Sequence, residues 1–324
     1  MTVLEAREAH PRWGPRTIEQ FLRRRLGDKT PSERTIARIL KRANLVKSRR
    51  RRPLPNVVER APEVEATAPN DVWTIDFKGW WRTRDGARCE PLTVRDAYSR
   101  YLLAVDICST KTADARKTLD RLFRKHGIPR AIQCDNGVPF VAVNARAGLS
   151  ALSAWWTALG IRIVRSRPGC PQDNGAHERM HRDLKSDVQK HPASSTAAQQ
   201  RDIDRWRQEF NHVRPHQALG GKTPAETYKP TERRPPVVRE PNYGPFRRSA
   251  AIGATGCFKL RGELYFVSGS LHRMRVGLES IDDTHLRVWF HELDLGVIEV
   301  LPRVAAHCFD PWKMKKTKRN KRAA

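Results

Sequence analysis

The sequence predicts an α/β fold class, with a mixed sheet flanked by helices as its central domain. Residues 70–108 contain three segments with the apolar pattern of strands, and from residue 112 onwards helical and strand patterns take turns. Because an antiparallel start passes into alternating α and β segments, these strands are expected to share one mixed sheet. At 324 residues, the chain is also long enough for more than one domain.

A helix-turn-helix is expected before this sheet. Residues 18–26 and 36–43 both show helical apolar spacing, and the turn GDKTPS between them offers Ser32 as an N-cap. The outward face of the second helix would carry four basic side chains, at the spacing with which a recognition helix meets a DNA groove. These candidate DNA-binding residues are Arg34, Arg38, Lys41 and Arg42. An ordinary helical hairpin with a basic surface remains the alternative.

The elements of the central domain follow in order. The strand VWTIDFKGWW places Trp73, Ile75 and Phe77 on one face, and two strands flank the turn DAYSR. The remaining elements are a helix over 112–126 that ends at Gly127, a strand over 131–134, a helix over 149–160, a strand over 161–168, a helix from Gly175, and a helix from Ala198 to the region of Pro215. Helices therefore alternate with strands after the first three strands.

Composition shifts divide the chain into domains. Proline-rich stretches without periodicity indicate linkers, and short strands with tight turns from Cys257 onwards indicate a small β-rich, β-barrel-like domain. The expected divisions are a helix-turn-helix domain at 1–46, a basic and Pro-rich linker at 47–69, the central α/β core at 70–230, a linker at 231–247, the β-rich domain at 248–308 and a basic tail at 309–324.

The composition indicates a polyanionic partner. The chain has 62 Lys and Arg against 35 Asp and Glu, which gives a formal net charge of +27. Such an excess attracts phosphate backbones at long range, so nucleic acid is the expected partner and a merely soluble basic surface is the alternative. The sequence shows neither a secretory signal nor an apolar stretch of membrane length, so a cytoplasmic, nucleoid-associated protein without membrane contact is expected.

Three acids stand at comparable places in the central domain. Asp76 lies in its first strand, Asp135 at the end of a later strand, and Glu178 near the start of a helix. A single aspartate at a strand end is more often a turn former, and Asp96 in DAYSR is interpreted in that way. Three carboxylates without basic partners repel one another, so together they indicate Mg²⁺ or Mn²⁺. Two such ions ~3.5–4 Å apart suit phosphoryl transfer.

Longer sequence motifs surround these three acids. They are IDFKG around Asp76, CDNGVPF around Asp135 and RPGCPQDNGAHERMHRDLKSD around Glu178, with FNHVRPHQALGGKTPAETY after them. Together they resemble bacterial insertion-sequence transposases with a retroviral-integrase-type core, most of all the insertion sequence 481 family. The resemblance implies a ribonuclease-H-like fold in which these three acids are catalytic and bind metal. It also implies cleavage of DNA ends, strand transfer into target DNA, and a homo-oligomer on DNA.

The chain departs from that family at its N-terminus, and its acid spacing departs from that of retroviral integrases but not from that of the insertion-sequence group. Family members commonly carry a further helix-turn-helix upstream, so an N-terminally shortened protein is expected, and a catalytically silent DNA-binding remnant is an alternative. The spacing between Asp135 and Glu178 exceeds that usual in retroviral integrases, and the extra length is expected within VAVNARAGLSALSAWW. Asp173 is therefore the less favoured third acid.

The segment HERMH also fits the pattern H-E-x-x-H of zinc proteases. A zinc site would use His177 and His181 as ligands and would leave Asp76 and Asp135 without a role, so this alternative is less favoured. The two histidines are expected to contact DNA or to cap the site.

The helix that carries HERMH is expected to have two different faces. Met180, Leu184 and Val188 recur at four-residue spacing and would face the core. Arg182 and Lys185 would share the opposite face with Glu178, where they are candidates for binding the DNA backbone; a solvated charged face is the alternative.

Overall fold

The computed structural model describes residues 1–46, 64–142, 145–166, 175–236, 241–245 and 247–301. The chain divides into two compact units, Met1–Val238 and Arg239–Ala324. The basic tail, most of the first linker and Asp173 lie outside the described residues. None of the described helices is both long enough and apolar enough to cross a bilayer.

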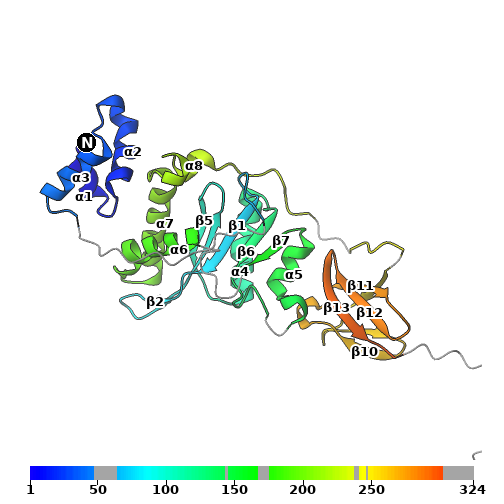
Figure 1. Ribbon diagram of the computed structural model, residues 1–324. Helices are drawn as coiled ribbons and strands as arrows, with labels where there is room; N and C mark the ends of the chain where they lie inside the picture. Colours follow the sequence, from blue (N-terminus) through cyan, green and yellow to red (C-terminus); the bar gives the residue numbers. More distant parts are fainter. Residues whose placement is uncertain (47–63, 143–144, 167–174, 237–240, 246, 302–324) are drawn as a thin grey trace, which may run out of the picture. The chain divides into compact units, whose positions relative to one another are not determined.

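Three helices open the first unit: α1 (Val3–Ala9), α2 (Pro15–Leu26) and α3 (Glu33–Arg42) (Figure 1). The two expected helices are confirmed, and the Ser32 hydroxyl caps α3 by accepting a hydrogen bond from the Thr35 backbone N–H at 3.3 Å. Helix α1 was not expected, because seven residues are too few to show a helical period. The three helices share a small core made of Val3, Ala6, Trp13, Ile18, Phe21, Leu22, Ile36 and Leu40.

The central sheet has five strands in the order β5-β4-β1-β6-β7 (Figure 1). Their bounds are β1 (Val72–Phe77), β4 (Pro91–Asp96), β5 (Leu102–Ile107), β6 (Ala131–Cys134) and β7 (Arg162–Arg165). Strand β4 runs antiparallel to both β1 and β5, whereas β6 runs parallel to β1 and to β7. The predicted mixed sheet is therefore confirmed. An additional hairpin, β2 (Trp81–Arg82) with β3 (Arg88–Cys89), follows β1.

Helices cover both faces of this sheet. One face packs against α4 (Thr112–His126) and α5 (Ala151–Ala158), and the other packs against α6 (Gly175–Leu184) and α7 (Thr196–His212). The first unit also contains the π-helical turn η4 (Lys185–Gln189), helix α8 (Pro224–Thr227), and the 3-10 turns η1 (Gly27–Lys29, between α2 and α3), η2 (Arg146–Gly148) and η5 (Gln217–Leu219). The expected helices are thus present. Helix α4 ends at Gly127, whose positive φ of 80° favours glycine.

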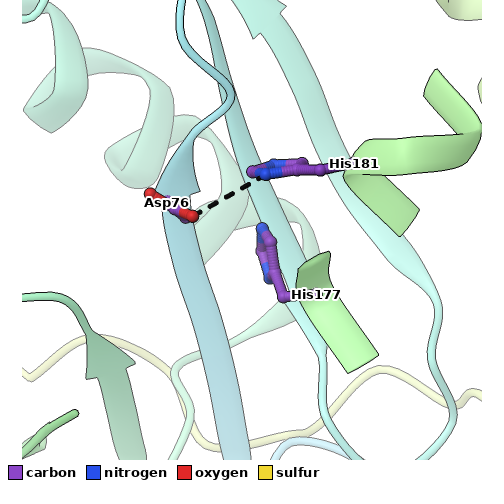
Figure 2. Close-up of side chains that lie close together, drawn as sticks. All are labelled: Asp76, His177 and His181. Atoms are coloured by element: carbon purple, nitrogen blue, oxygen red, sulfur yellow. Dashed lines mark ion pairs between the residues drawn. The ribbon is translucent and has the colours of Figure 1, made fainter. Parts of the chain in front are cut away.

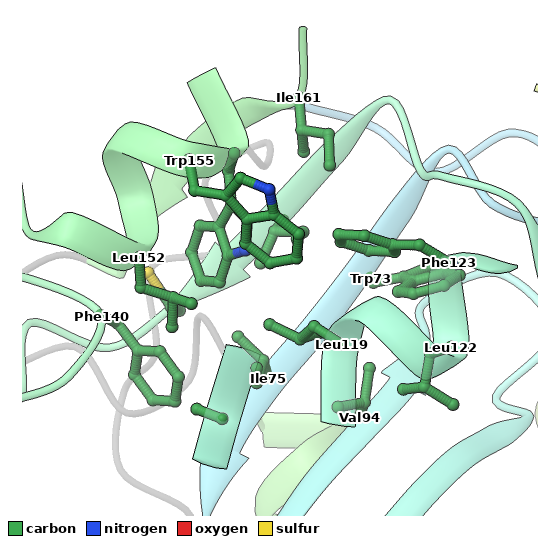
Figure 3. Packing of buried hydrophobic residues seen from close by; sticks show 14 of the residues in the cluster. Trp73, Ile75, Val94, Leu119, Leu122, Phe123, Phe140, Leu152, Trp155 and Ile161 are labelled. Atoms are coloured by element: carbon green, nitrogen blue, oxygen red, sulfur yellow. The ribbon is translucent and has the colours of Figure 1, made fainter. Parts of the chain in front are cut away.

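The alternation along β1 builds the core on one face. Trp73 and Ile75 are fully buried among residues of α4 and α5, including Leu119, Phe123 and Trp155 (Figure 3). The other face of the sheet packs against α6 and α7 through a second cluster: Trp81, Cys89, Leu102, Val105, Met180, Leu184, Val188, Ile203, Trp206 and Phe210. Because apolar packing holds β1 from one side and α6 from the other, Asp76 and Glu178 are carried on fixed elements.

The described residues of the second unit form mainly strands. Its elements are β8 (Arg248–Ala251), β9 (Cys257–Leu260), β10 (Glu263–Phe266), the 3-10 turn η6 (Gly269–Leu271), β11 (Arg275–Ser280), β12 (His285–Phe290) and β13 (Leu293–Glu299). A four-stranded antiparallel sheet has the order β13-β12-β11-β8, and β9 pairs with β10 in a hairpin. Strand β8 was not expected, because RSAA lacks the β-branched and aromatic residues typical of strands.

Candidate carboxylate site

Two neighbouring parallel strands and one helix position the three acids. Asp76 is the fifth residue of β1, and Asp135 directly follows β6, which pairs with β1 in parallel. Glu178 lies in the first turn of α6, which packs on the same sheet. Ends of parallel neighbours that point the same way meet at one edge of a sheet, so β1 and β6 bring the two aspartates together.

The negative charges of Asp135 and Glu178 act on Asp76. The pKa of Asp76 is raised to about 7, first by burial and then by the negative charges of Asp135 and Glu178. The Phe77 backbone N–H and the Lys78 ammonium partly oppose this rise. The Asp76 side chain is 25% exposed, whereas Asp135 and Glu178 are exposed residues. The site is therefore a partly open cluster of like charges.

The turn after β6 holds Asp135 in place. As expected for a sharp turn, the Gly137 backbone N–H donates a hydrogen bond to Asp135 Oδ1 at 3.1 Å, and the Asn136 amide donates to the Ser166 carbonyl at 2.8 Å. A Cβ atom at residue 137 would lie 3.0 Å from Asp135 Oδ2. A glycine at this position therefore leaves room for the carboxylate.

Lys78 is a residue of the site that sequence reasoning missed. It is half-buried, and its pKa is lowered first by burial and then by Lys185, while Asp76 acts in the opposite direction. Residues 76 and 78 are two positions apart along the extended chain, so they share a side of it. This two-residue spacing from Asp76 was the sequence feature that could have identified Lys78 as a residue of the site. Lys78 brings a positive charge to the edge of the acid cluster.

The two histidines of HERMH point inward (Figure 2). His177 is fully buried, with Nδ1 at 2.9 Å from the Thr74 hydroxyl and Nε2 at 2.6 Å from the Thr93 hydroxyl. His181 Nε2 lies 2.9 Å from the same Thr93 hydroxyl, and its Nδ1 lies 3.7 Å from Asp76 Oδ2. The expectation that His177 contacts DNA is wrong, because a fully buried ring has no surface to offer.

Burial keeps both imidazoles neutral. It places the pKa of His177 well below its ordinary value, with His181 adding to the effect. The pKa of His181 is lowered to about 3, by burial first and then by the positive charges of Lys78 and Arg95.

A zinc-protease site does not fit this arrangement. Asp76, His177 and His181 each offer one ligand atom within 4.8 Å of the others, so the cluster needs testing as a zinc site. Both ring nitrogens of His177 are already engaged by the hydroxyls of Thr74 and Thr93. The Nε2 atoms of the two histidines converge on the Thr93 oxygen, which stands where H-E-x-x-H enzymes need the ion.

The expected faces of α6 are present. Met180, Leu184 and Val188 are buried in the core, as predicted. Arg182 and Lys185 are exposed, as is Glu178. The DNA contacts expected of these two basic residues stay a prediction.

Two other acids of the sheet do not join the site. Asp96 is fully buried at the end of β4, where it accepts hydrogen bonds from Asn70 and Ser99, which confirms its role in the DAYSR turn. Asp106 on β5 forms an ion pair with Arg121 of α4.

The basic residues expected to bind DNA lie on the outer face of α3. Arg34, Arg38, Lys41 and Arg42 are exposed, while Ile36 and Leu40 of the same helix are buried. Within the described residues, none of the four basic side chains has an ion-pair partner. Their charge therefore stays available to a polyanion.

Comparisons with known proteins show what the chain is similar to. Two models described as integrase core domain match the chain, over residues 66–171 and 159–224. The chain is 29% identical over 228 residues to an uncharacterized 39.2 kDa protein of insertion element IS476 from Xanthomonas euvesicatoria, which covers 69% of this chain. It spans only 62% of that relative. It is 30% identical over 199 residues to an uncharacterized 31.7 kDa protein of insertion element IS407 from Burkholderia multivorans, covering 60% of this chain and 68% of the relative.

Two solved structures with similar parts are viral. The HTLV-2 integrase catalytic core domain in complex with magnesium is 16% identical, with a TM-score of 0.36, and covers 51% of this chain and 100% of its own. A chain of the simian T-cell lymphotropic virus intasome in complex with a PP2A regulatory subunit is 16% identical, with a TM-score of 0.43, and covers 93% of this chain and 100% of its own.

Proposed function

Because the chain belongs to the bacterial insertion-sequence transposases with an integrase-type, ribonuclease-H-like core, we propose that it is a DNA transposase. It would cut the phosphodiester at the ends of its element with water and then join the resulting 3′-hydroxyl to target DNA. The observation that supports this proposal is that the pKa of Asp76 is raised by burial and by the negative charges of Asp135 and Glu178.

The chemistry of the acid cluster fits a hard divalent cation. Lys78 offsets the repulsion only in part, since the pKa of Asp76 stays at about 7. Carboxylate oxygens are the ligands that Mg²⁺ and Mn²⁺ prefer, so Asp76, Asp135 and Glu178 would hold the metal, as two ions in our proposal. When bound, the ions would activate the attacking oxygen and stabilise the charge on the leaving oxygen.

The basic residues around the cluster would position the DNA. Lys78 lies beside Asp76, and Arg182 of α6 and Lys185 of η4 are exposed like Glu178, so all three basic residues would bind backbone phosphates next to the scissile bond. Arg34, Arg38, Lys41 and Arg42 on α3 would bind a DNA groove.

The remaining parts of the chain would serve assembly on DNA. We assign DNA binding to the helical residues 1–46 and to the basic tail, and contact with DNA or a second subunit to the β-rich residues 248–308. Two element ends have to be held side by side for coordinated insertion, so a homo-oligomer on DNA is proposed. This activity belongs in the bacterial cytoplasm, at the nucleoid.

The test is Mn²⁺-dependent cleavage and strand transfer of a labelled duplex that carries the element's own ends. We expect activity from the wild type and from Asp202→Asn, a surface carboxylate on α7, and none from Asp135→Asn. If all three proteins bind the duplex and none cuts it, the protein is a silent DNA-binding remnant. A zinc protease would retain casein hydrolysis in Asp135→Asn, because that acid has no role in H-E-x-x-H chemistry.

A further inference from the structure

A single hydroxyl connects the two histidines to the backbone beside the acid cluster. Thr93 lies opposite Asp76 in the antiparallel pair of β4 with β1. Its Oγ1 is 2.8 Å from the Asp76 carbonyl oxygen, 2.6 Å from His177 Nε2 and 2.9 Å from His181 Nε2. Three polar partners therefore share one hydroxyl group.

The hydrogens of this group can be assigned one by one. A carbonyl oxygen only accepts, so the one hydrogen of Thr93 is donated to the Asp76 carbonyl. The two lone pairs of Thr93 then accept hydrogen bonds, and both histidines must donate to them from Nε2. Each imidazole therefore carries its proton on Nε2 and has a bare lone pair on Nδ1.

The two bare nitrogens have different surroundings. His177 Nδ1 accepts a hydrogen bond from the Thr74 hydroxyl at 2.9 Å, so this nitrogen is used within the core. His181 Nδ1 instead faces Asp76 Oδ2 at 3.7 Å, which is too long for a hydrogen bond (Figure 2). A lone pair and a carboxylate oxygen thus face each other without a proton between them.

This separation suits two ligands of one ion. Two donor atoms that each lie ~2.1 Å from a cation are ~3 Å apart at a right angle and ~4.2 Å apart when opposite. The 3.7 Å between His181 Nδ1 and Asp76 Oδ2 falls inside that interval. Histidines that bind metals usually donate their other ring N–H to a fixed acceptor, which is the role of Thr93 towards His181 Nε2.

We propose that His181 is a nitrogen ligand, through Nδ1, of the ion held by Asp76, with Thr93 as the residue that orients its ring. This inference rests on the proposed metal-dependent function and specifies the donor set of its site. A nitrogen donor favours Mn²⁺ and especially Co²⁺ over Mg²⁺, because imidazole binds transition metals better than it binds hard cations.

The test is electron spin echo spectroscopy of the untagged full chain with Mn²⁺, in which a directly bound imidazole gives a ¹⁴N modulation. We expect this modulation in the wild type and in His191→Asn, a control histidine that is exposed and follows η4. It should be absent in His181→Asn. Calorimetric titrations should show that His181→Asn weakens Co²⁺ binding by roughly tenfold or more and Mg²⁺ binding by less.

The possible outcomes separate this inference from the function on which it rests. Bound Mn²⁺ without a nitrogen modulation in the wild type overturns the role of His181 and leaves the carboxylate site intact. A modulation that persists in His181→Asn also overturns it, since another nitrogen is then the ligand. A wild type that binds no Mn²⁺ and cuts no DNA refutes both proposals. Thr93→Val, which removes the orienting hydroxyl, should weaken the modulation without abolishing Mn²⁺ binding.

Discussion

Asp76 and Asp96 belong to hydrogen-bonded neighbouring strands of one sheet, yet their surroundings are opposite in kind. The Asp96 carboxylate is fully buried and accepts hydrogen bonds from the Asn70 backbone N–H at 2.7 Å, the Ser99 backbone N–H at 2.7 Å and the Ser99 hydroxyl at 2.5 Å. The Asp76 carboxylate has one backbone donor, at Phe77, and two acids as neighbours.

The difference separates a structural carboxylate from a functional one. Burial raises the pKa of both residues, but at Asp96 the hydrogen bonds counteract the rise, whereas at Asp76 the charges of Asp135 and Glu178 add to it. A carboxylate with satisfied oxygens stabilises its turn, whereas one with a single backbone donor still has oxygen lone pairs available to a cation. Substitutions at the two positions should therefore affect different measurements.

The largest expected effect is on catalysis at Asp76. Asp76→Asn keeps the side-chain volume and removes a metal ligand, so we expect the rate of DNA cleavage to fall by roughly a thousandfold or more, since metal stabilisation of the transition state is worth several kcal/mol. Circular dichroism and duplex binding should stay as in the wild type. Cleavage at more than about a tenth of the wild-type rate would remove Asp76 from the catalytic set.

The next effect is on stability, at Asp96. Asp96→Ala leaves the backbone N–H groups of Asn70 and Ser99 buried without an acceptor, so the free energy of unfolding should fall by about 3 kcal/mol in urea titrations. The control Asp202→Ala breaks a surface ion pair with Arg205 and should cost less than about 1 kcal/mol. Equal losses in the two variants would show that the hydrogen bonds of Asp96 are not what stabilises the turn.

A smaller effect should appear in the pH dependence of the metal-free protein. Folding raises the pKa of Asp76 from 3.8 to about 7, so between these pH values the folded state binds more protons than the unfolded state and stability falls as the pH rises. Asp76→Asn has no charge to desolvate. With a chelator present, the free energy of unfolding of Asp76→Asn relative to that of the wild type should therefore increase by about 2 kcal/mol from pH 5 to pH 8.

Two comparisons test the predicted direction of this pH dependence. Saturating Mg²⁺ should reduce the difference at pH 8, because the ion neutralises the carboxylate that burial disfavours. If the difference between the wild type and Asp76→Asn is the same at pH 5 and pH 8, the carboxylate titrates alike in the folded and unfolded states, and the mutual repulsion in the cluster is absent.

Local sequence patterns were sufficient to predict the buried face of β1 and to select the three candidate acids. The alternation of VWTIDF predicted that Trp73 and Ile75 are buried, as they are. From the positions of Asp76, Asp135 and Glu178 near the ends of their elements we expect the three acids to converge, which stays a prediction. These properties follow from the period of a strand and from the direction of parallel neighbours, both of which are visible along the chain.

The surroundings of the two histidines could not be predicted, because they depend on contacts between segments that are distant in the sequence. The position of Thr93 opposite Asp76 is a matter of strand register, and the burial of His177 follows from how α6 packs on β1 and β4. Neither property has a local signal, so HERMH could not be separated from a zinc motif by its spacing alone. The four-residue spacing of Met180, Leu184 and Val188 predicted which face of the helix is buried, but not which partners His177 meets there.

The smallest expected effect is on DNA binding, and it depends on whether an exposed arginine has an ion-pair partner. Arg38 on α3 is exposed without an ion-pair partner among the described residues, whereas Arg23 on α2 pairs with Glu19 at 2.8 Å. Arg38→Ala should weaken duplex binding by about 1 kcal/mol and reduce the slope of log K against log salt by about 1, because one phosphate contact is lost. Arg23→Ala should change neither quantity measurably, since a paired side chain has less charge to offer a phosphate. Equal losses in fluorescence-anisotropy titrations of the two variants would mean that α3 is not the DNA-facing helix and that the basic surface acts as a whole.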